Sequence, residues 1–425
     1  MTYNYYINIL NSLIKVLDTY KIFNDDELQE LNKTIYTLII QYMRDNIHDI
    51  IDYTFDREII TSVYEIMDMH IREIFSNNTK LYPIVEIKIK SLIKENLIKA
   101  YSDYIPPRSY KTSFLRYIKR DAKFIKNINK KIDYLYSIPQ PEQRSENWYI
   151  FRHKLITASS VWKIFKSGSS RNQLIYEKCE PYTIPGKISP SSSLHWGQKY
   201  EPISVQLYEY LYTTKVGDFG CIQHPKYNFI GASPDGIIID KKSSRYGRML
   251  EIKNIVNRVI DGIPKMEYWI QMQIQMETCD LNECDFLETQ FIEYDSYNDY
   301  IADGSFNNTN DNKYKGIILL FCEDENLIYE YAPFNIGEEE YKKWENEIMD
   351  KNIDKEWIQN IYWKLEKYSN VLVLRNKLWF NNVVDSIKEV AEIIENEKVT
   401  GYEHRAPNKR KLNKITSENK CLINI

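Results

Sequence analysis

A predicted strand that is interrupted by proline, an acid and glycine sets the strongest constraint on this chain. In GASPDGIIID, residues 231–240, Pro234, Asp235 and Gly236 separate two apolar parts. Proline and glycine weaken the interior of a strand, and a buried aspartate needs a partner. The interruption therefore predicts either a turn or a functional site at Asp235.

A second acidic motif, MLEIKN at residues 249–254, follows closely. On a strand, Glu251 and Lys253 point to the same face, and the Ile252 carbonyl lies between them. The intervening KKSSRYG is typical of a turn, so Asp235 and Glu251 are expected on neighbouring antiparallel strands. Two carboxylates and one carbonyl oxygen suit a hard cation such as Mg²⁺, with Mn²⁺ as a substitute.

This set of groups fits the hydrolysis of a phosphodiester. The anionic phosphodiester repels hydroxide, so the reaction needs positive charge to generate the nucleophile and to neutralise the developing oxyanion. Lys253, beside the metal, would orient the attacking water or help to deprotonate it. The pattern alone is short and degenerate, and its alternative interpretation is a turn followed by a surface ion pair.

Composition limits the class of protein. The 425 residues, 43% of them hydrophobic, are enough for two or three packed domains. The sequence has neither a long apolar run nor an apolar N-terminal segment, so we expect a soluble, intracellular protein without membrane contact. The formal net charge of -4 means that any binding to nucleic acid must come from local patches.

The periodicity predicts an α/β protein with helical extensions at both ends. The expected regions are a helical N-terminal domain at 1–107, a basic helix and linker at 108–142, an α/β core at 143–336, a helical region at 337–400 and a basic tail at 401–425. Within the core, residues 145–165 and 195–212 have the pattern of helices. Residues 138–143, IPQPEQ, are typical of a linker.

Residues 108–131 hold nine basic residues and one acid. Apolar residues recur there at helical spacing, which places the basic side chains on the other face of an amphipathic helix. The candidates for phosphate contacts on that face include Arg116, Lys119, Arg120 and Lys123. A solvated helix face is an equally good interpretation of the same pattern.

Five ordered blocks between residues 144 and 295 resemble the YqaJ-type viral recombinases, the family of phage lambda exonuclease within the PD-(D/E)xK nucleases. They are SENWYIFRHKLITASSV, WGQKYEP, ASPDG, LEIK and YWIQMQIQM. The resemblance covers roughly a third of the chain. It implies a restriction-endonuclease-like core, with a mixed β-sheet flanked by helices, and a metal-dependent DNA nuclease activity.

The resemblance also implies roles for residues outside the two acidic motifs. In the family an acid on a helix helps to hold metal, so the resemblance implies that Glu201 joins Asp235 and Glu251 as a metal ligand. The residues that would contact phosphate are Arg152, Ser159, Ser233, Gln271 and Gln273. Read without the resemblance, each of these is as well explained by an ordinary helix or turn position.

Partners and source follow from the same resemblance. We expect double-stranded DNA as substrate, with a homo-oligomer and a recombination or helicase partner as further options. The abundance of residues with A/T-rich codons and the family together suggest a giant DNA virus, and hence the host cytoplasm or viral factory. The extensions at both ends have no counterpart in the compact lambda-type enzyme, so ring assembly and strict polarity are not expected from the sequence.

Three alternatives stay open. The first is a RecB/Cas4-like nuclease of the same superfamily, although the 6 scattered cysteines lack the close spacing of an iron–sulfur site. The second is a nuclease of the superfamily that cuts internally. The third is a non-catalytic DNA-binding scaffold for recombination.

Overall fold

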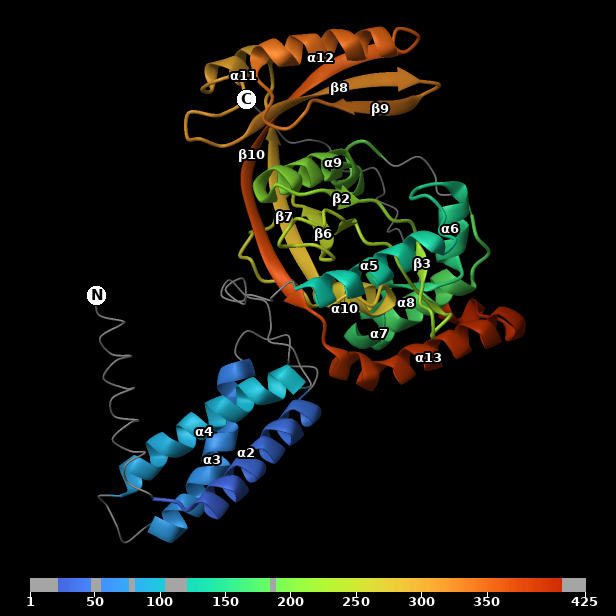
Figure 1. Cartoon of the computed structure of the whole chain (residues 1–425). Helices are drawn as coiled ribbons and strands as arrows, with labels where there is room; N and C mark the ends of the chain where they lie inside the picture. Colours follow the sequence, from blue (N-terminus) through green and yellow to red (C-terminus); the bar gives the residue numbers. More distant parts are fainter. Residues whose placement is uncertain (1–21, 47–54, 76–80, 104–120, 184–188, 407–425) are drawn as a thin grey trace, which may run out of the picture.

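The computed structural model describes residues 22–46, 55–75, 81–103, 121–183 and 189–406. A mixed β-sheet forms the centre of the larger body, and helices cover both of its faces (Figure 1). This confirms the predicted fold class, an α/β core with a mixed sheet and flanking helices.

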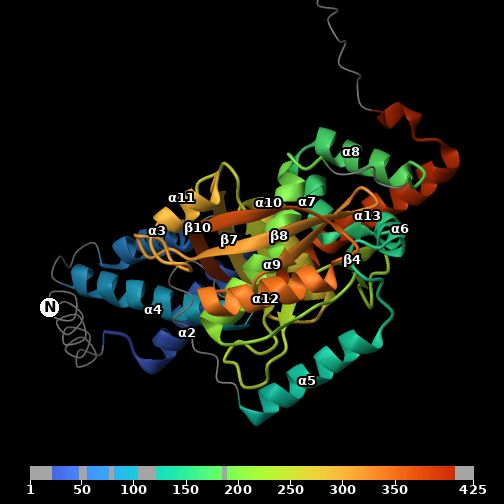
Figure 2. The same ribbon diagram turned by 90° about the horizontal axis from the view of Figure 1, so that it is seen from above.

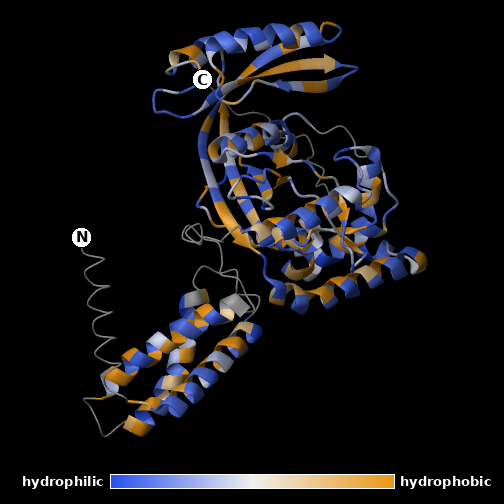
Figure 3. Ribbon diagram, in the orientation of Figure 1, coloured by the Kyte–Doolittle hydropathy of each residue, from blue (hydrophilic) through white to orange (hydrophobic). Residues whose placement is uncertain are grey.

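Three amphipathic helices make up the N-terminal region: α2 (Asp25–Asp45), α3 (Phe55–Phe75) and α4 (Tyr82–Asp103). Asn24 caps α2 by a capping box with Glu27, as the sequence pattern indicates. Aliphatic side chains such as Ile39, Val63 and Ile89 are buried between the helices. In Figure 3 apolar and polar stretches alternate along all three helices, as expected for helices that pack on one face only.

The main sheet has seven strands in the order β2-β5-β6-β7-β10-β8-β9. In chain order they are β2 (Val216–Gly217), β5 (Gly236–Ile238), β6 (Met249–Asn254), β7 (Glu283–Glu293), β8 (Lys315–Glu323), β9 (Asn326–Tyr331) and β10 (Glu356–Leu374). The pair β6–β7 is parallel, and the other pairs are antiparallel. A small sheet of order β1-β4-β3 lies beside it, made of β1 (Ile156–Thr157), β3 (Ile222–Gln223) and β4 (Ile230–Ala232).

The remaining helices pack on the two sheets or on one another. They are α5 (Ala122–Ser137), α6 (Glu146–His153), α7 (Ala158–Lys166), α8 (Gly168–Cys179), α9 (Ser193–Tyr212), α10 (Met266–Thr278), α11 (Tyr297–Ala302), α12 (Glu338–Lys351), α13 (Lys377–Thr400) and the short η3 (Glu403–Arg405). Helix α9 packs on one face of β6, through Leu250 and Ile252, and α10 packs on the other. Because side chains alternate along a strand, Glu251 and Lys253 face α10.

A buried charge cluster occupies the α9 face of the same strands. Asp285 of β7 is 1% exposed and accepts hydrogen bonds from Tyr208 of α9 at 2.6 Å and from Arg248 at 3.0 Å. Arg245 also contacts it, and Arg248 pairs with Glu283 at 3.1 Å. Two acids and two arginines therefore balance one another in this group, which we call the Asp285 cluster.

The segment 145–165 is not one continuous helix. The chain leaves α6 at His153, forms the short strand β1, and starts α7 at Ala158. Strand β1 pairs in parallel with β4, with Ile156 opposite Ile230. The β-branched Ile156 and Thr157 suit a strand, and this tertiary pairing outweighs the helical periodicity of the segment.

The prediction of a purely helical region at 337–400 is wrong for residues 356–374. These residues form β10, the longest strand, which lies between β7 and β8. The distal part of the sheet is covered by α11 and α12, through an aromatic cluster that includes Tyr300 and Tyr341. Figure 2 shows this end from above, with α12 next to β8 and β10. The predicted core boundary at residue 336 therefore cuts through the observed sheet.

The predicted basic helix is described only from residue 121 onward. Helix α5 begins after the N-cap Asp121, and Lys123 is exposed on it. Arg116, Lys119 and Arg120 lie outside the described residues. Among the helices of the described ranges, none is long and apolar enough to cross a membrane.

Candidate active site

The site begins where β5 and β6 separate. Gly236 pairs with Leu250 at the start of β5, so Pro234 and Asp235 have left the ladder when β6 reaches Ile252. The Ile252 N–H donates to Asp235 Oδ2 at 2.7 Å. In a strand the N–H and C=O of one residue point to the same edge, so the Ile252 carbonyl also faces the Asp235 side of β6. Because the apolar run is interrupted, Asp235 lies outside the β5–β6 ladder, and its side chain accepts from the edge of β6 that β5 leaves unpaired.

Glu251 is fully buried and receives three hydrogen-bond donors. Gln271 and Gln275 of α10 donate to its two carboxylate oxygens at 2.7 Å each. Lys253, two residues further along the same face of β6, forms an ion pair with Glu251. These contacts hold the carboxylate in one orientation and connect it to α10.

Lys253 is held in its charged form. Burial alone would lower its pKa, but the carboxylates of Glu251 and Asp235 outweigh burial and raise the pKa above the ordinary value for lysine. Its ammonium therefore acts here as a hydrogen-bond donor and a positive charge. The predicted geometry of two acids and one lysine on neighbouring strands is present.

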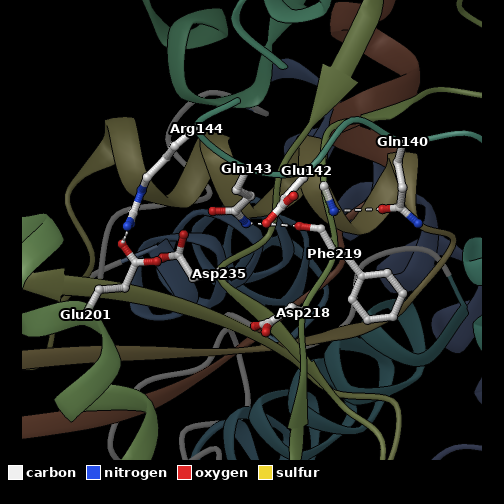
Figure 4. A pocket seen from close by; sticks show the side chains of 9 residues that line it. Gln140, Glu142, Gln143, Arg144, Glu201, Asp218, Phe219 and Asp235 are labelled. Carbon is white, nitrogen blue, oxygen red and sulfur yellow. Dashed lines mark hydrogen bonds and ion pairs between the residues drawn. The ribbon is translucent and has the colours of Figure 1, made fainter. Parts of the chain in front are cut away.

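A cavity of about 410 Å³ opens in front of Asp235. Figure 4 shows Glu201, from α9, with its carboxylate next to that of Asp235. Arg144 donates from Nη2 to Glu201 Oε2 at 2.7 Å. The walls of the cavity come from two stretches, 140–144 and 218–220, in addition to Glu201 and Asp235. Glu201 thus reaches the site from a helix, as the resemblance implies.

The lining of this cavity is rich in negative charge. Its ionisable residues are Glu142, Glu201, Asp218, Asp235 and Arg144, which amount to four acids and one base. Enclosure raises the pKa of Asp235 well above its ordinary range, and the charges of Glu251 and Glu201 raise it further. Enclosure likewise raises the pKa of Glu201, an effect that Arg144 partly offsets. Among the residues that line the cavity, the acids therefore outnumber the bases.

Several oxygen atoms around Asp235 could serve as ligands of a divalent cation. The oxygens of Asp235 and Glu201, with the Ile252 carbonyl on the same edge, are ligands that Mg²⁺ accepts. Gln275 Oε1 is buried without a hydrogen-bond partner in the described structure. Within the described ranges, no group of three or more His, Cys, Asp or Glu side chains is placed so that together they could hold a metal ion. The residues fit a cation held mainly by Asp235 and Glu201 that keeps several waters. Glu251, predicted as a further ligand, has both carboxylate oxygens engaged by Gln271, Gln275 and Lys253.

A candidate anion site, formed by one arginine and two serines, lies next to these carboxylates. Arg152, at the end of α6, donates to Ser233 Oγ at 3.0 Å and to Ser159 Oγ at 3.2 Å. Its guanidinium also stacks over the Trp148 ring. Burial lowers the pKa of Arg152, which nevertheless stays charged near neutral pH. The break between α6 and α7 lets Arg152 and Ser159 converge, and Ser233 is two residues from Asp235.

Part of the chain is similar to a known protein family. Residues 147–282 match the YqaJ-like viral recombinase domain. The YqaJ-like domain includes Arg152, Glu201, Asp235 and Glu251.

One relative extends beyond the YqaJ-like domain. The chain is 30% identical over 344 residues to the uncharacterized protein R354 of Acanthamoeba polyphaga mimivirus, which covers 71% of this chain and 59% of that protein. The chain thus spans about three-fifths of the length of this relative. The shared region is longer than the YqaJ-like domain itself.

Two solved structures are also similar. One is LHK-Exo in complex with dAMP, with 18% identity, a TM-score of 0.36, and coverage of 60% of this chain and 94% of that one. The other is an alkaline exonuclease (LHK-Exo) from Laribacter hongkongensis, with 18% identity, a TM-score of 0.33, and coverage of 61% and 95%. At these TM-scores neither comparison bears on the details of the site.

The glutamines of the YqaJ-like domain divide between two faces of α10. Gln271 and Gln275 are one helical turn apart and both reach Glu251. Gln273 is fully buried on another face, where it donates to the Leu374 carbonyl at 2.9 Å and accepts from the Asn376 N–H at 2.6 Å. The prediction that Gln273 contacts phosphate is therefore wrong, and Gln275 is the residue that the sequence analysis missed.

Three further site residues precede the YqaJ-like domain, and two of them, Gln140 and Gln143, lie in the segment interpreted as a linker. The Gly220 N–H donates to Gln140 Oε1 at 2.8 Å, and Gln143 donates to the Phe219 carbonyl at 2.9 Å. Arg144 then reaches Glu201. Proline-rich, polar sequence is typical of both linkers and structured loops, so the sequence offered no signal for these contacts.

Proposed function

We propose that this chain is a Mg²⁺-dependent deoxyribonuclease that hydrolyses phosphodiester bonds and processes the ends of duplex DNA. Viral recombination, repair or defence against foreign DNA would use such an activity. The observation that carries the proposal is the placement of Asp235, Glu201, Glu251 and Lys253 beside the anion site of Arg152. A phosphate held by Arg152 and Ser233 would lie within reach of the carboxylates.

Each group of the chain has a distinct task in the proposed reaction. Asp235 and Glu201 would hold the cation, which, when bound, supplies a Lewis acid and a water of lowered pKa. Glu251 fixes the ammonium of Lys253. Because Lys253 is charged, it would orient the water and stabilise the anionic phosphate rather than remove a proton.

Arg152 would position the substrate. A guanidinium binds phosphate oxygens through two parallel hydrogen bonds, and Ser159 and Ser233 can each add a hydroxyl donor. Such a pocket suits either the scissile phosphate or a terminal phosphate next to it. The second option would make the enzyme specific for DNA ends.

The decisive experiment incubates linear duplex DNA with the protein and Mg²⁺, with Asp235→Ala and Lys253→Ala as inactive controls. Metal-dependent release of nucleotides from the unmodified chain alone supports the proposal. Tight binding without cleavage would point to a scaffold for recombination instead. Iron and brown colour in the purified protein would indicate the RecB/Cas4-like alternative.

The mode of cleavage needs a second set of substrates. Linear, nicked and closed circular duplexes, with phosphate or hydroxyl at the 5′ end, separate end processing from internal cleavage. We expect linear DNA to be degraded and closed circles to survive. Cleavage of closed circles would exclude a purely exonucleolytic enzyme.

We further propose that α5 contributes to binding of the duplex. Lys123, Lys126 and Lys130 are exposed on it. Charge reversal at Lys123 and Lys126 should lower the slope of log K against log salt by roughly 2, because each lysine that neutralises a phosphate releases about one counterion. An unchanged slope would remove α5 from the interface, and sedimentation would test for a homo-oligomer in the same samples.

A further inference from the structure

Arg144 stands out among the residues around the cavity. It is the one base among the ionisable residues that line it, and it pairs with Glu201 at 2.7 Å. Figure 4 shows its side chain extended toward Glu201. The proposed nuclease function uses Glu201 as a metal ligand, so the guanidinium occupies a place that a cation would need.

The backbone aims this side chain. Arg144 has a φ of 68°, a left-handed conformation that side chains with a Cβ adopt rarely. The next residue, Ser145, caps α6 by accepting from the Trp148 N–H and closes a turn by donating to the Glu142 carbonyl. The turn and the cap together hold Arg144 in its strained conformation at the entrance of the site.

The segment before Arg144, residues 140–143, is fastened to the strand end that carries Asp235. Gln143 donates to the carbonyls of Phe219 and Pro234, and Pro234 directly precedes Asp235. A Cβ on Gly220 would lie 2.1 Å from the Pro141 carbonyl oxygen, so only glycine allows this close approach. The base of the Arg144 side chain is therefore fixed, while its guanidinium is on the more exposed side of the ion pair, at 43% against 27% for Glu201.

We propose that Arg144 is a positioning residue that holds Glu201 while the metal is absent and turns to a DNA phosphate when a divalent cation takes Glu201. The inference rests on the proposed nuclease function. A guanidinium binds carboxylate and phosphate with the same fork of donors, so the exchange keeps its hydrogen bonds. Metal and arginine then compete for one carboxylate, whereas arginine and metal cooperate in binding DNA.

The competition gives Arg144→Met opposite effects on the two ligands. Loss of the positive charge should tighten Mn²⁺ binding about tenfold, because the carboxylates lose a rival cation. It should weaken binding of a duplex oligonucleotide about tenfold, because a phosphate contact is lost. Mn²⁺ binding is read by electron paramagnetic resonance, and DNA binding by fluorescence anisotropy with Ca²⁺ in place of Mg²⁺ to prevent turnover.

Two matched variants make the test specific. Arg144→Lys keeps the charge and should leave Mn²⁺ affinity within about twofold. Arg171→Met removes an arginine from another surface pair, with Glu389 at 2.7 Å, and should change neither affinity. A thermal melt of each variant reports whether the fold is retained.

The outcomes separate this inference from the proposed function. Arg144→Met with tighter Mn²⁺ and weaker DNA binding supports it, since a purely structural role would weaken both. Unchanged or weaker Mn²⁺ binding in a variant that melts like the unmodified protein overturns it. If the unmodified chain cleaves DNA in that case, the nuclease proposal survives and only the role of Arg144 is lost; if the unmodified chain neither binds Mn²⁺ nor cleaves, both fall.

Discussion

Two groups of enclosed carboxylates lie around strand β6, and they differ in charge balance. In the Asp285 cluster, burial alone would raise the pKa of Asp285, but Arg248 and Arg245 outweigh burial and lower it. At the candidate site, the pKa of Asp235 is raised by enclosure and by other acids. Acids that are matched by arginines are typical of a structural ion-pair cluster. Acids that outnumber the neighbouring bases are typical of a site that binds a cation, and this contrast predicts a structural role for Asp285 and a functional role for Asp235.

The largest expected effect is that of Asp235→Asn on catalysis. The change keeps the shape of the side chain and removes a carboxylate that would hold the metal, so the rate should fall on the order of 10³-fold. Stability should stay the same or rise, because repulsion from Glu251 and Glu201 is relieved. Single-turnover kinetics and a denaturant titration measure the two quantities, and a variant that cleaves normally would contradict the assignment.

Asp285→Asn should have the reverse signature. It leaves Arg245 and Arg248 with an unpaired buried charge, so the free energy of unfolding should drop by about 3–5 kcal/mol. The remaining folded fraction should keep its rate per active site. If Asp285→Asn were as stable as the unmodified protein, the Asp285 cluster would not have the structural role that the comparison assigns to it.

The two faces of α10 allow the same comparison within one helix. Gln273→Leu removes bonds to backbone groups of Leu374 and Asn376, so it should cost about 1–3 kcal/mol of stability without a change in rate. Gln271→Leu should leave stability nearly unchanged and lower the rate about tenfold, since it loosens Glu251. If both variants lowered the rate equally, Gln273 would have to be counted among the residues of the active site.

The smallest effect is a dependence of stability on pH and Mg²⁺. A carboxyl whose pKa is raised in the folded state keeps a proton that the unfolded chain loses, so Asp235 makes the metal-free protein less stable as pH rises through the ordinary carboxyl range and toward its raised pKa. A divalent cation replaces that proton. Mg²⁺ at ten times its Kd should stabilise by about 1.4 kcal/mol, more at about pH 8 than at about pH 5.

Scanning calorimetry at both pH values, with and without Mg²⁺, measures this dependence. Asp235→Asn is the control, because it cannot titrate and should show a much smaller pH dependence of the Mg²⁺ effect. An equal Mg²⁺ effect at both pH values in the unmodified protein would argue against a raised pKa at the metal site. The Asp285 cluster should contribute the opposite trend, with stability lost as pH falls through its lowered pKa.

The sequence predicted the core of the site well because its residues lie in short local patterns. Asp235, Glu251 and Lys253 follow from strand alternation and one turn, and the resemblance added Glu201, Arg152 and Ser159 from other elements. Gln273 was misplaced because a helix repeats every 3.6 residues, so a pattern of alternate glutamines does not reveal which of them share a face. The expected phosphate roles remain predictions.

Long-range contacts account for most of the remainder. Residues 356–374 lie between two charged helices in the sequence. No local sequence pattern indicates that this segment pairs with β7. Likewise, residues 140–144 become part of the site only through contacts with 218–220 and Glu201. Such pairings depend on the tertiary fold and not on local propensity.

Strand β10 also has a consequence for how the chain is made. During synthesis β7 leaves the ribosome well before β10, with β8, β9 and α12 in between. Until β10 is complete, the edge of β7 has no partner strand, and an open edge invites pairing with other chains. Because α10 is bonded to Leu374 and Asn376 at the end of β10, the α/β core closes only after residues 356–376 have been translated. Premature termination within this region would release an aggregation-prone chain rather than a smaller folded protein.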